Sequence, residues 1–205
     1  MQALLKDIAR LKKGGVAKAV ARRVSEFKEN RRDPEKAFSE LCFCICTANN
    51  SAERGLRAQA EIDFRGLDER RLRKRMREVV CRFYNHKTDY ILAARGLRKE
   101  LLRQVQSARS GVELREWIVK SVKGLGYKEA SHFLRNIGFD DVAIIDFHII
   151  DLLVRHGLIG RPKALARKDY LRIEGKLSEL AKRSKTTLAE LDLYLWYLET
   201  GKILK

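Results

Sequence analysis

The chain of 205 residues carries a formal net charge of +17, with 45% hydrophobic and 35% charged residues. Its length suits one domain or two small lobes that share a core, and the charged fraction exceeds the usual value of about a quarter. Such an excess of positive charge favours a polyanionic partner, and nucleic acid is the polyanion that we expect. No apolar run reaches the roughly 18 residues that cross a bilayer, and no signal peptide is present, so we expect a cytoplasmic, nucleoid-associated protein with no membrane partner.

The four cysteines, Cys42, Cys44, Cys46 and Cys81, have no spacing typical of a disulfide framework or a metal site. On a helix, Cys42 and Cys46 share a face while Cys44 points elsewhere. We therefore expect buried thiols that pack as small apolar residues.

Apolar residues recur at helical spacing through most of the chain, and the alternation typical of strands is scarce, so we predict an all-α fold. The first segment, Met1 to Lys13, is amphipathic, and a core helix is favoured over a helix lying on a membrane surface. The polar segment Thr47–Ser51 is expected to be a loop or the cap of the next helix, and no breaker interrupts the run from Cys81 to Ile91. Further helices are predicted near residues 16–27, 34–46, 69–80, 112–122, 127–137, 170–184 and 188–200.

Gly124, Leu125 and Gly126 separate two of these predicted helices. Glycine adopts positive φ at little cost, so this tripeptide can fold the chain back tightly and leave backbone amides pointing outward at the start of the next helix. Amides at a helix N-terminus form a site for a phosphate group. The next residue but one, Lys128, falls in the first turn of that helix, where positive partial charge already accumulates. A lysine there costs stability, and the same field favours the free amine of a nucleophile.

Asp146 follows an apolar run and precedes a helical pattern, so we predict that it caps the helix that begins at Phe147. Taken alone, each feature has an ordinary structural explanation, since many helix pairs join through glycines and most aspartates at this position only cap a helix. Together, the hairpin, the first-turn Lys128 and the Asp146-Phe147-His148 sequence favour catalysis.

This combination resembles the helix-hairpin-helix DNA glycosylases, which carry a catalytic lysine in the second hairpin helix and an aspartate beyond it. The resemblance implies that Lys128 is the nucleophile and Asp146 the catalytic carboxylate. It also implies two helical lobes with the active site in the cleft between them. We place the lobes at residues 1–33 plus 146–205 and at residues 34–145, the second containing the hairpin.

The pattern around Arg82, Phe83 and Tyr90, with the lysine that ends the chain, resembles the second, short, archaeal-type class of 8-oxoguanine DNA glycosylase. By this resemblance Phe83 and Trp196 hold the extruded base between them, and Lys205 meets the guanine edge. A flipped base needs such stacking faces and polar groups. Two ordinary alternatives stay open: Trp196 as a core residue and Lys205 as a disordered terminus. The polar residues after the third predicted helix are further candidates for DNA contact: Asn49, Asn50 and Ser51.

The resemblance implies a bifunctional glycosylase and AP lyase that excises 8-oxoguanine from double-stranded DNA and works as a monomer. It implies no redox cofactor or divalent metal, although hairpin carbonyls hold a monovalent cation in the family. Some relatives bind an iron–sulfur cluster through four cysteines after the aspartate; no cysteine follows Cys81, so no such cluster is expected. Two alternatives remain: a glycosylase for oxidised pyrimidines or mismatches, and a helix-hairpin-helix protein that binds DNA without catalysis.

Overall fold

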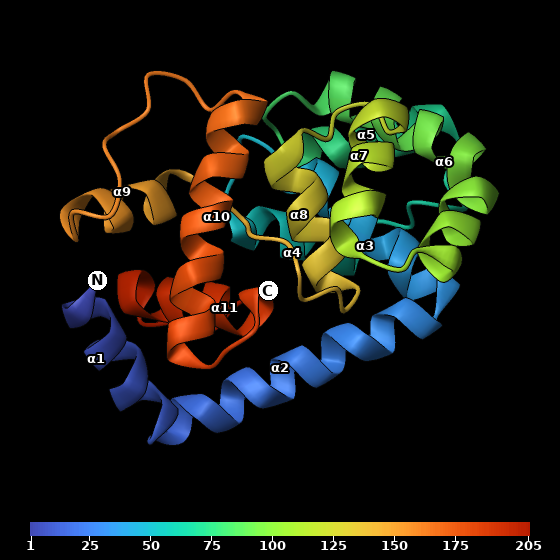
Figure 1. The fold of residues 1–205 in the computed structure, drawn as a ribbon. Coiled ribbons are helices and arrows are strands. Elements are labelled where there is room, and N and C mark those ends of the chain that lie inside the picture. The colour runs from blue at the N-terminus through green and yellow to red at the C-terminus, as the bar shows by residue number, and fades with distance from the viewer. The chain divides into compact units, whose positions relative to one another are not determined.

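A computed structural model describes residues 1–205 and contains eleven α-helices and no strand, which confirms the predicted all-α fold (Figure 1). None of the helices is both long and apolar enough to span a bilayer. In chain order the helices are α1 Gln2–Lys12, α2 Gly15–Arg32, α3 Pro34–Thr47, α4 Ala52–Glu61, α5 Glu69–Val79, α6 Tyr84–Ser107, α7 Gly111–Ser121, α8 Tyr127–Asn136, α9 Phe147–Arg155, α10 Arg167–Ser184 and α11 Leu188–Thr200.

The helices divide into two compact units, and the chain crosses between them twice. One unit comprises Met1–Glu29 and Leu134–Lys205, and the other comprises Asn30–Phe133. The chain therefore returns to the terminal unit at Leu134, inside α8, whereas the sequence-based boundary was placed at residue 146.

The terminal unit is built around α10, which packs against α1 and α11, while α11 also contacts α9 (Figure 1). Apolar side chains spaced by about one helical turn line the contacts: Leu4 and Ile8 of α1 and Ile173 and Leu177 of α10 are all buried. Gly138 ends α8 with φ of 86°, and a Cβ atom there would lie 2.7 Å from the Cα of Lys28. Only glycine permits this approach of the α8 end to the backbone of α2, in agreement with the predicted C-terminal cap.

The other unit is organised around α3, which contacts α4 and α6. Asp33 caps this helix through hydrogen bonds from the amides of Glu35 and Lys36, and Pro34 occupies its first position. All residues from Ala37 to Thr47 are buried except Ser39, so α3 is enclosed on nearly every side. The sequence predicted only an apolar stripe; the small cysteines and Thr47 allow the helix from Ala37 onward to enter the core, while its first turn stays exposed.

The chain between Val80 and Phe83 is not helical, although no breaker marks the sequence there. The predicted helix at 69–80 ends at Val79, and α6 begins at Tyr84. Cys81 and Phe83 adopt φ of 61° and 54°, a left-handed conformation that costs most side chains about 1–2 kcal/mol. The sequence from Cys81 to Ile91 gave no sign of this turn, because it contains no breaker and the turn is required by the packing of α5 on α6.

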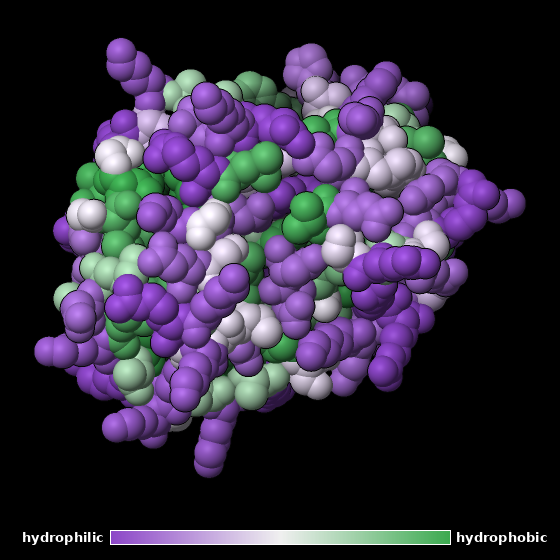
Figure 2. All heavy atoms as spheres, in the orientation of Figure 1, coloured by the Kyte–Doolittle hydropathy of each residue, from purple (hydrophilic) through white to green (hydrophobic).

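Most side chains on the face shown in Figure 2 are hydrophilic, as the high charge requires. Hydrophobic side chains gather at the left of that view, where Figure 1 places α9.

Candidate active site

The hairpin between α7 and α8 uses its two glycines differently. Gly124 adopts φ of 86°, and a Cβ atom there would lie 2.2 Å from the ring of Tyr90. Gly126 is outside the left-handed region, and its nearest neighbour for an added Cβ is a carboxylate oxygen of Glu129 at 3.8 Å. Gly124 is therefore required for folding the turn, whereas Gly126 leaves the start of α8 uncovered. The carbonyl of Gly126 accepts a hydrogen bond from the amide of Ala130, and this bond closes the first turn of α8.

Contacts made by two side chains, Tyr127 and Arg115, fix α7 and α8 in this hairpin. The phenol of Tyr127 donates to the carboxylate of Glu116, whose two oxygens lie 2.7 and 2.8 Å away. Arg115, with no exposed surface, donates to the hydroxyl of Ser131 at 3.0 Å and places its guanidinium over the ring of Tyr127. Sequence reasoning missed these residues, because a charged arginine at a buried helix position gives no periodic signal.

Lys128 lies in the first turn of α8, as predicted, with 28% of its side chain exposed. Its amine is 3.5 Å from a carboxylate oxygen of Glu129, and that side chain is only 18% exposed. Neighbouring residues on a helix point about 100° apart, so this pair forms only because both long side chains bend toward each other. The amine is thus held near the helix N-terminus, partly shielded from water.

A second lysine of the same unit, Lys87 in α6, is 3% exposed. Its amine donates to the carbonyl of Cys46 at 2.8 Å, in the last turn of α3. A lysine at a helix C-terminus satisfies a carbonyl that has no partner within the helix. Burial lowers the pKa of Lys87, and the negative charge of Glu129 opposes that change.

Asp146 caps α9, as predicted, and accepts the amide of Ile149 at 3.0 Å. The segment before it is attached to α10 by two buried side chains. The hydroxyl of Tyr170 donates to the carbonyl of Ala143 at 2.7 Å, and Glu174 accepts the amide of the same residue at 2.8 Å. These contacts fix the backbone that ends at Asp146, and no local pattern in the sequence indicated them.

Three aromatic rings of the terminal unit follow one another beside Asp146. The ring of Phe147 lies 4.0 Å from the imidazole of His148, and that imidazole meets Trp196 of α11 edge to face at 5.1 Å. The indole nitrogen of Trp196 is buried and donates no hydrogen bond. Trp196 is half-buried, as is Lys205, four residues beyond the cap of α11 at Gly201.

Phe83 projects from the left-handed turn before α6 and is 52% exposed, with the guanidinium of Arg82 over its ring at 5.5 Å. Asn50 supports this turn, since its side-chain amide donates to the carbonyl of Val80 at 3.0 Å. An aromatic face held in the solvent by an uncommon backbone conformation is typical of a residue kept for contact with a ligand.

The three polar candidates after α3 have distinct structural positions. Ser51 caps α4 by accepting the amide of Arg54, and Asn50 bonds to Val80 as described. Asn49 is exposed and adopts φ of 52°. Two of the three therefore have a structural explanation, and Asn49 presents its side chain to solvent.

The three cysteines of α3 are buried thiols, as expected, whereas the prediction was wrong for Cys81, which is exposed in the turn before α6. Burial raises the pKa of Cys46 to about 12, and it also raises that of Cys42. A thiol that holds its proton at neutral pH is a poor metal ligand and a poor nucleophile. No group of three or more His, Cys, Asp or Glu side chains is arranged to hold a metal ion.

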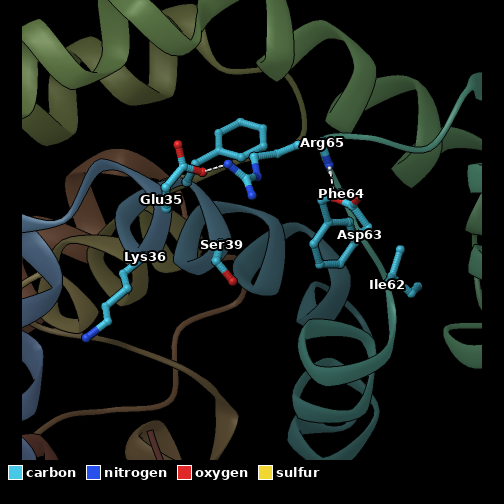
Figure 3. Close-up of a pocket in the computed structure, with 8 residues that line it drawn as sticks. Glu35, Lys36, Ser39, Ile62, Asp63, Phe64 and Arg65 are labelled. Atoms are coloured by element: carbon cyan, nitrogen blue, oxygen red, sulfur yellow. Dashed lines mark hydrogen bonds and ion pairs between the residues drawn. The ribbon is translucent and has the colours of Figure 1, made fainter.

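A pocket of about 300 Å³ opens between the start of α3 and the α4–α5 loop (Figure 3). Its main charged groups are paired, because Glu35 forms ion pairs with both Arg65 and Arg98. The residues that line it are Glu35, Lys36, Phe38, Ser39, Ile62, Asp63, Phe64 and Arg65. None of them belongs to the predicted site.

A family model described as 8-oxoguanine DNA glycosylase matches residues 20–186. The chain is 48% identical to an 8-oxoguanine DNA glycosylase/AP lyase of Korarchaeum cryptofilum, and the match covers 98% of each chain. It is also similar to the crystal structure of Methanocaldococcus jannaschii 8-oxoguanine glycosylase/lyase in complex with 15mer DNA containing 8-oxoguanine, with a TM-score of 0.94, 43% identity, and 99% and 100% of the two chains covered. The 8-oxoguanine DNA glycosylase of Thermotoga maritima matches with a TM-score of 0.92 at 40% identity, over 100% of this chain and 99% of that one.

Proposed function

Because the chain belongs to the 8-oxoguanine DNA glycosylase family, we propose that it excises 8-oxoguanine from double-stranded DNA and then cleaves the strand at the abasic site. It is a DNA glycosylase with AP lyase activity, and the full-length similarity to relatives of that name supports this conclusion. The structural observation that carries the mechanism is Lys128, a shielded amine in the first turn of the helix that follows the glycine hairpin.

Lys128 acts as the nucleophile. The damaged nucleotide leaves the base stack, since its C1′ atom is otherwise out of reach. The amine attacks C1′, the bond from C1′ to the base breaks, and the base leaves with the bonding electrons. The new amine gives up a proton, and its nitrogen lone pair forms a double bond to C1′ as the bond from C1′ to the ring oxygen breaks. The ring oxygen takes the proton as a hydroxyl, and an iminium ion results. Removal of a C2′ proton then expels the 3′ phosphate and nicks the strand.

Asp146 supplies negative charge to the sugar. As the base departs, positive charge develops at C1′ and on the ring oxygen, and a fixed carboxylate stabilises that charge without reorganising. Its hydrogen bond from Ile149 and the anchoring of Ala143 fix the carboxylate before DNA arrives. Asp146 also orients the lysine amine or accepts a proton from it.

The hairpin holds the DNA backbone. The amides at the start of α8, beside Gly126, attract a phosphate through the positive end of the helix. The carbonyls of Lys123, Gly124 and Leu125 accept no backbone hydrogen bond. Such oxygen donors fit a monovalent cation, which these residues would hold and whose positive charge would attract the DNA backbone. No redox cofactor, iron–sulfur cluster or divalent metal takes part in the proposed steps.

Phe83, Trp196 and Lys205 recognise the extruded base. Exposure of Phe83 in its left-handed turn supports a stacking role, and the indole nitrogen of Trp196 has no acceptor within the protein. Lys205 presents its side-chain ammonium to the guanine edge as a hydrogen-bond donor. Asn49 adds a further DNA contact, whereas Asn50 and Ser51 act mainly through the turn and the α4 cap. The protein works as a monomer on chromosomal DNA in the nucleoid.

Single-turnover excision on four duplexes tests the function: one 8-oxoguanine, one uracil, one thymine glycol, and one abasic site. We expect base release only from the 8-oxoguanine duplex and strand cleavage of that duplex and the abasic one. A chain lacking Lys205 should lose most 8-oxoguanine release while it still cleaves the abasic duplex. Release of thymine glycol in preference to 8-oxoguanine would contradict the proposed substrate, and full activity without Lys205 would contradict the proposed base pocket.

A further inference from the structure

Phe147 is the most exposed of the large hydrophobic residues, with 65% of its surface open to solvent. The others are Phe83, Val112 and Leu165, at 52%, 43% and 37%. A single exposed hydrophobic residue is common and by itself carries no function. Phe147 differs because of its position and its neighbours.

Its position is fixed by the chain. Asp146 is the N-cap of α9 and Phe147 is the first helical residue, so their Cα atoms are about 3.8 Å apart. A sugar that lies beside the Asp146 carboxylate is therefore also near Phe147, whose ring is exposed to solvent.

Its neighbours form a continuous row of rings. Phe147 lies against His148 at 4.0 Å with the planes tilted by 36°, and His148 meets Trp196 at 5.1 Å and 89°. Adjacent residues on a helix do not normally face each other, so the Phe147 ring is turned back onto the imidazole. This contact restrains the ring while most of its surface stays in water, where a buried ring would be more stable by about 1.5–3 kcal/mol. A restrained, solvent-facing aromatic ring loses little freedom when a base stacks on it.

We propose that Phe147 is a DNA-contacting residue that stacks on the nucleotide adjoining the extruded one. The inference rests on the proposed function, because the Phe147 ring lies near an adjoining nucleotide only if Asp146 acts on the sugar of the extruded one. Extrusion of a base leaves its neighbours with one unstacked face, and an aromatic side chain replaces that lost stacking. Phe147 thus adds affinity for the distorted duplex, separately from the residues that hold the damaged base itself.

Binding is measured with the full chain carrying Lys128→Gln, so that the duplex is not cut. Two duplexes of one sequence are compared, one with a single 8-oxoguanine and one with guanine. Phe147→Ala and Phe147→Trp are added to this chain, and Leu165→Ala serves as the control because it removes another exposed apolar side chain of the same unit.

Phe147→Ala should weaken binding of the 8-oxoguanine duplex by about fivefold to a hundredfold, the range that follows from the loss of one stacked base. Phe147→Trp should bind within about threefold of the parent, and Leu165→Ala should bind like it. The guanine duplex should be affected much less, since its bases stay stacked.

Equal affinity of Phe147→Ala and the parent for the 8-oxoguanine duplex would overturn the proposal. The same loss for both duplexes would also overturn it, because the ring would then contact DNA without regard to extrusion. A large fall in Tm shared by the Ala and Trp variants would assign Phe147 to folding instead. The wild-type chain is assayed in parallel for release of 8-oxoguanine; failure there would reject the proposed function, independently of the Phe147 comparison.

Discussion

The hydroxyl of Tyr170 donates a hydrogen bond to the carbonyl of Ala143 at 2.7 Å and accepts one from the amide of Ile145 at 3.3 Å. A side chain of α10 thereby satisfies two buried backbone groups of the segment that ends at Asp146. This segment has no helix or sheet partners of its own, so its geometry depends on Tyr170 and on Glu174.

Tyr170→Phe should therefore lower the free energy of unfolding by about 1–3 kcal/mol, because the carbonyl and the amide both lose their partner. Excision should also slow, since the backbone before Asp146 becomes less fixed. Urea unfolding and single-turnover excision measure the two effects. Tyr194→Phe is the control: Tyr194 is buried in α11, and no hydrogen bond of its hydroxyl contributes to the structure. Equal effects of the two substitutions would contradict the role of Tyr170.

Gly126→Ala should weaken DNA binding and leave the Tm almost unchanged. The added Cβ meets nothing closer than 3.8 Å in the protein, but it lies where we propose that a phosphate approaches the amides of α8. Binding to a duplex with 8-oxoguanine, measured in the Lys128→Gln chain, and thermal unfolding separate the two properties.

Gly124→Ala provides the contrast. Positive φ and a 2.2 Å clash with Tyr90 should lower the Tm strongly, whereas Gly96→Ala in α6, where nothing lies within 4 Å, should not. Unimpaired DNA binding by Gly126→Ala would contradict the phosphate site at the hairpin.

Asp146→Asn should slow excision by about a hundredfold or more, because the variant lacks the negative charge that stabilises the sugar. It should cost less than about 1 kcal/mol of stability, since asparagine caps a helix nearly as well as aspartate. Asp146→Ala loses both the charge and the hydrogen bond to Ile149, so it should be slow and also less stable by about 0.5–2 kcal/mol. An Asn variant with nearly wild-type excision would show that Asp146 only caps α9.

Lys87 should make stability depend on pH in the alkaline range. Burial lowers its pKa from the ordinary value of 10.5, so between the folded pKa and 10.5 the unfolded chain binds more protons than the folded one. The free energy of unfolding contributed by Lys87 therefore rises with pH across that window, and below the window the desolvated charge is unfavourable. Urea unfolding of the wild-type and Lys87→Met proteins at several pH values up to 10.5 measures the difference between their free energies of unfolding. If the difference in free energy of unfolding did not change with pH, the lowered pKa of Lys87 would not be a source of pH-dependent stability.

Local features of the sequence predicted much of the candidate site. The start of α8 near Tyr127, Lys128 in its first turn, the Asp146 cap and the glycine that ends α8 were all confirmed. Each depends on a few consecutive residues, because caps and turns are fixed by short-range hydrogen bonds and by φ. The all-α fold was confirmed on the same basis, from the helical spacing of apolar residues.

Features that depend on distant residues could not be predicted in this way. The left-handed Cys81 and Phe83 lie in a run that contains no helix breaker, and only the packing of α5 on α6 reveals the turn. The sequence predicts a surface position for Arg115, and its burial is explained only by its contacts with Ser131 and Tyr127 in the folded protein. Tyr170 meets Ala143 across 27 residues, a separation that no helical period connects.

The most direct test of the central claim is borohydride trapping of the protein on a duplex that contains one 8-oxoguanine. Reduction of the iminium ion links Lys128 to the opened sugar, so we expect a covalent protein–DNA adduct with the wild-type chain and none with Lys128→Gln. Peptide mapping of the adduct should place the sugar on Lys128. An adduct of equal yield with Lys128→Gln, or a sugar attached to another lysine, would contradict the assignment of Lys128 as the nucleophile.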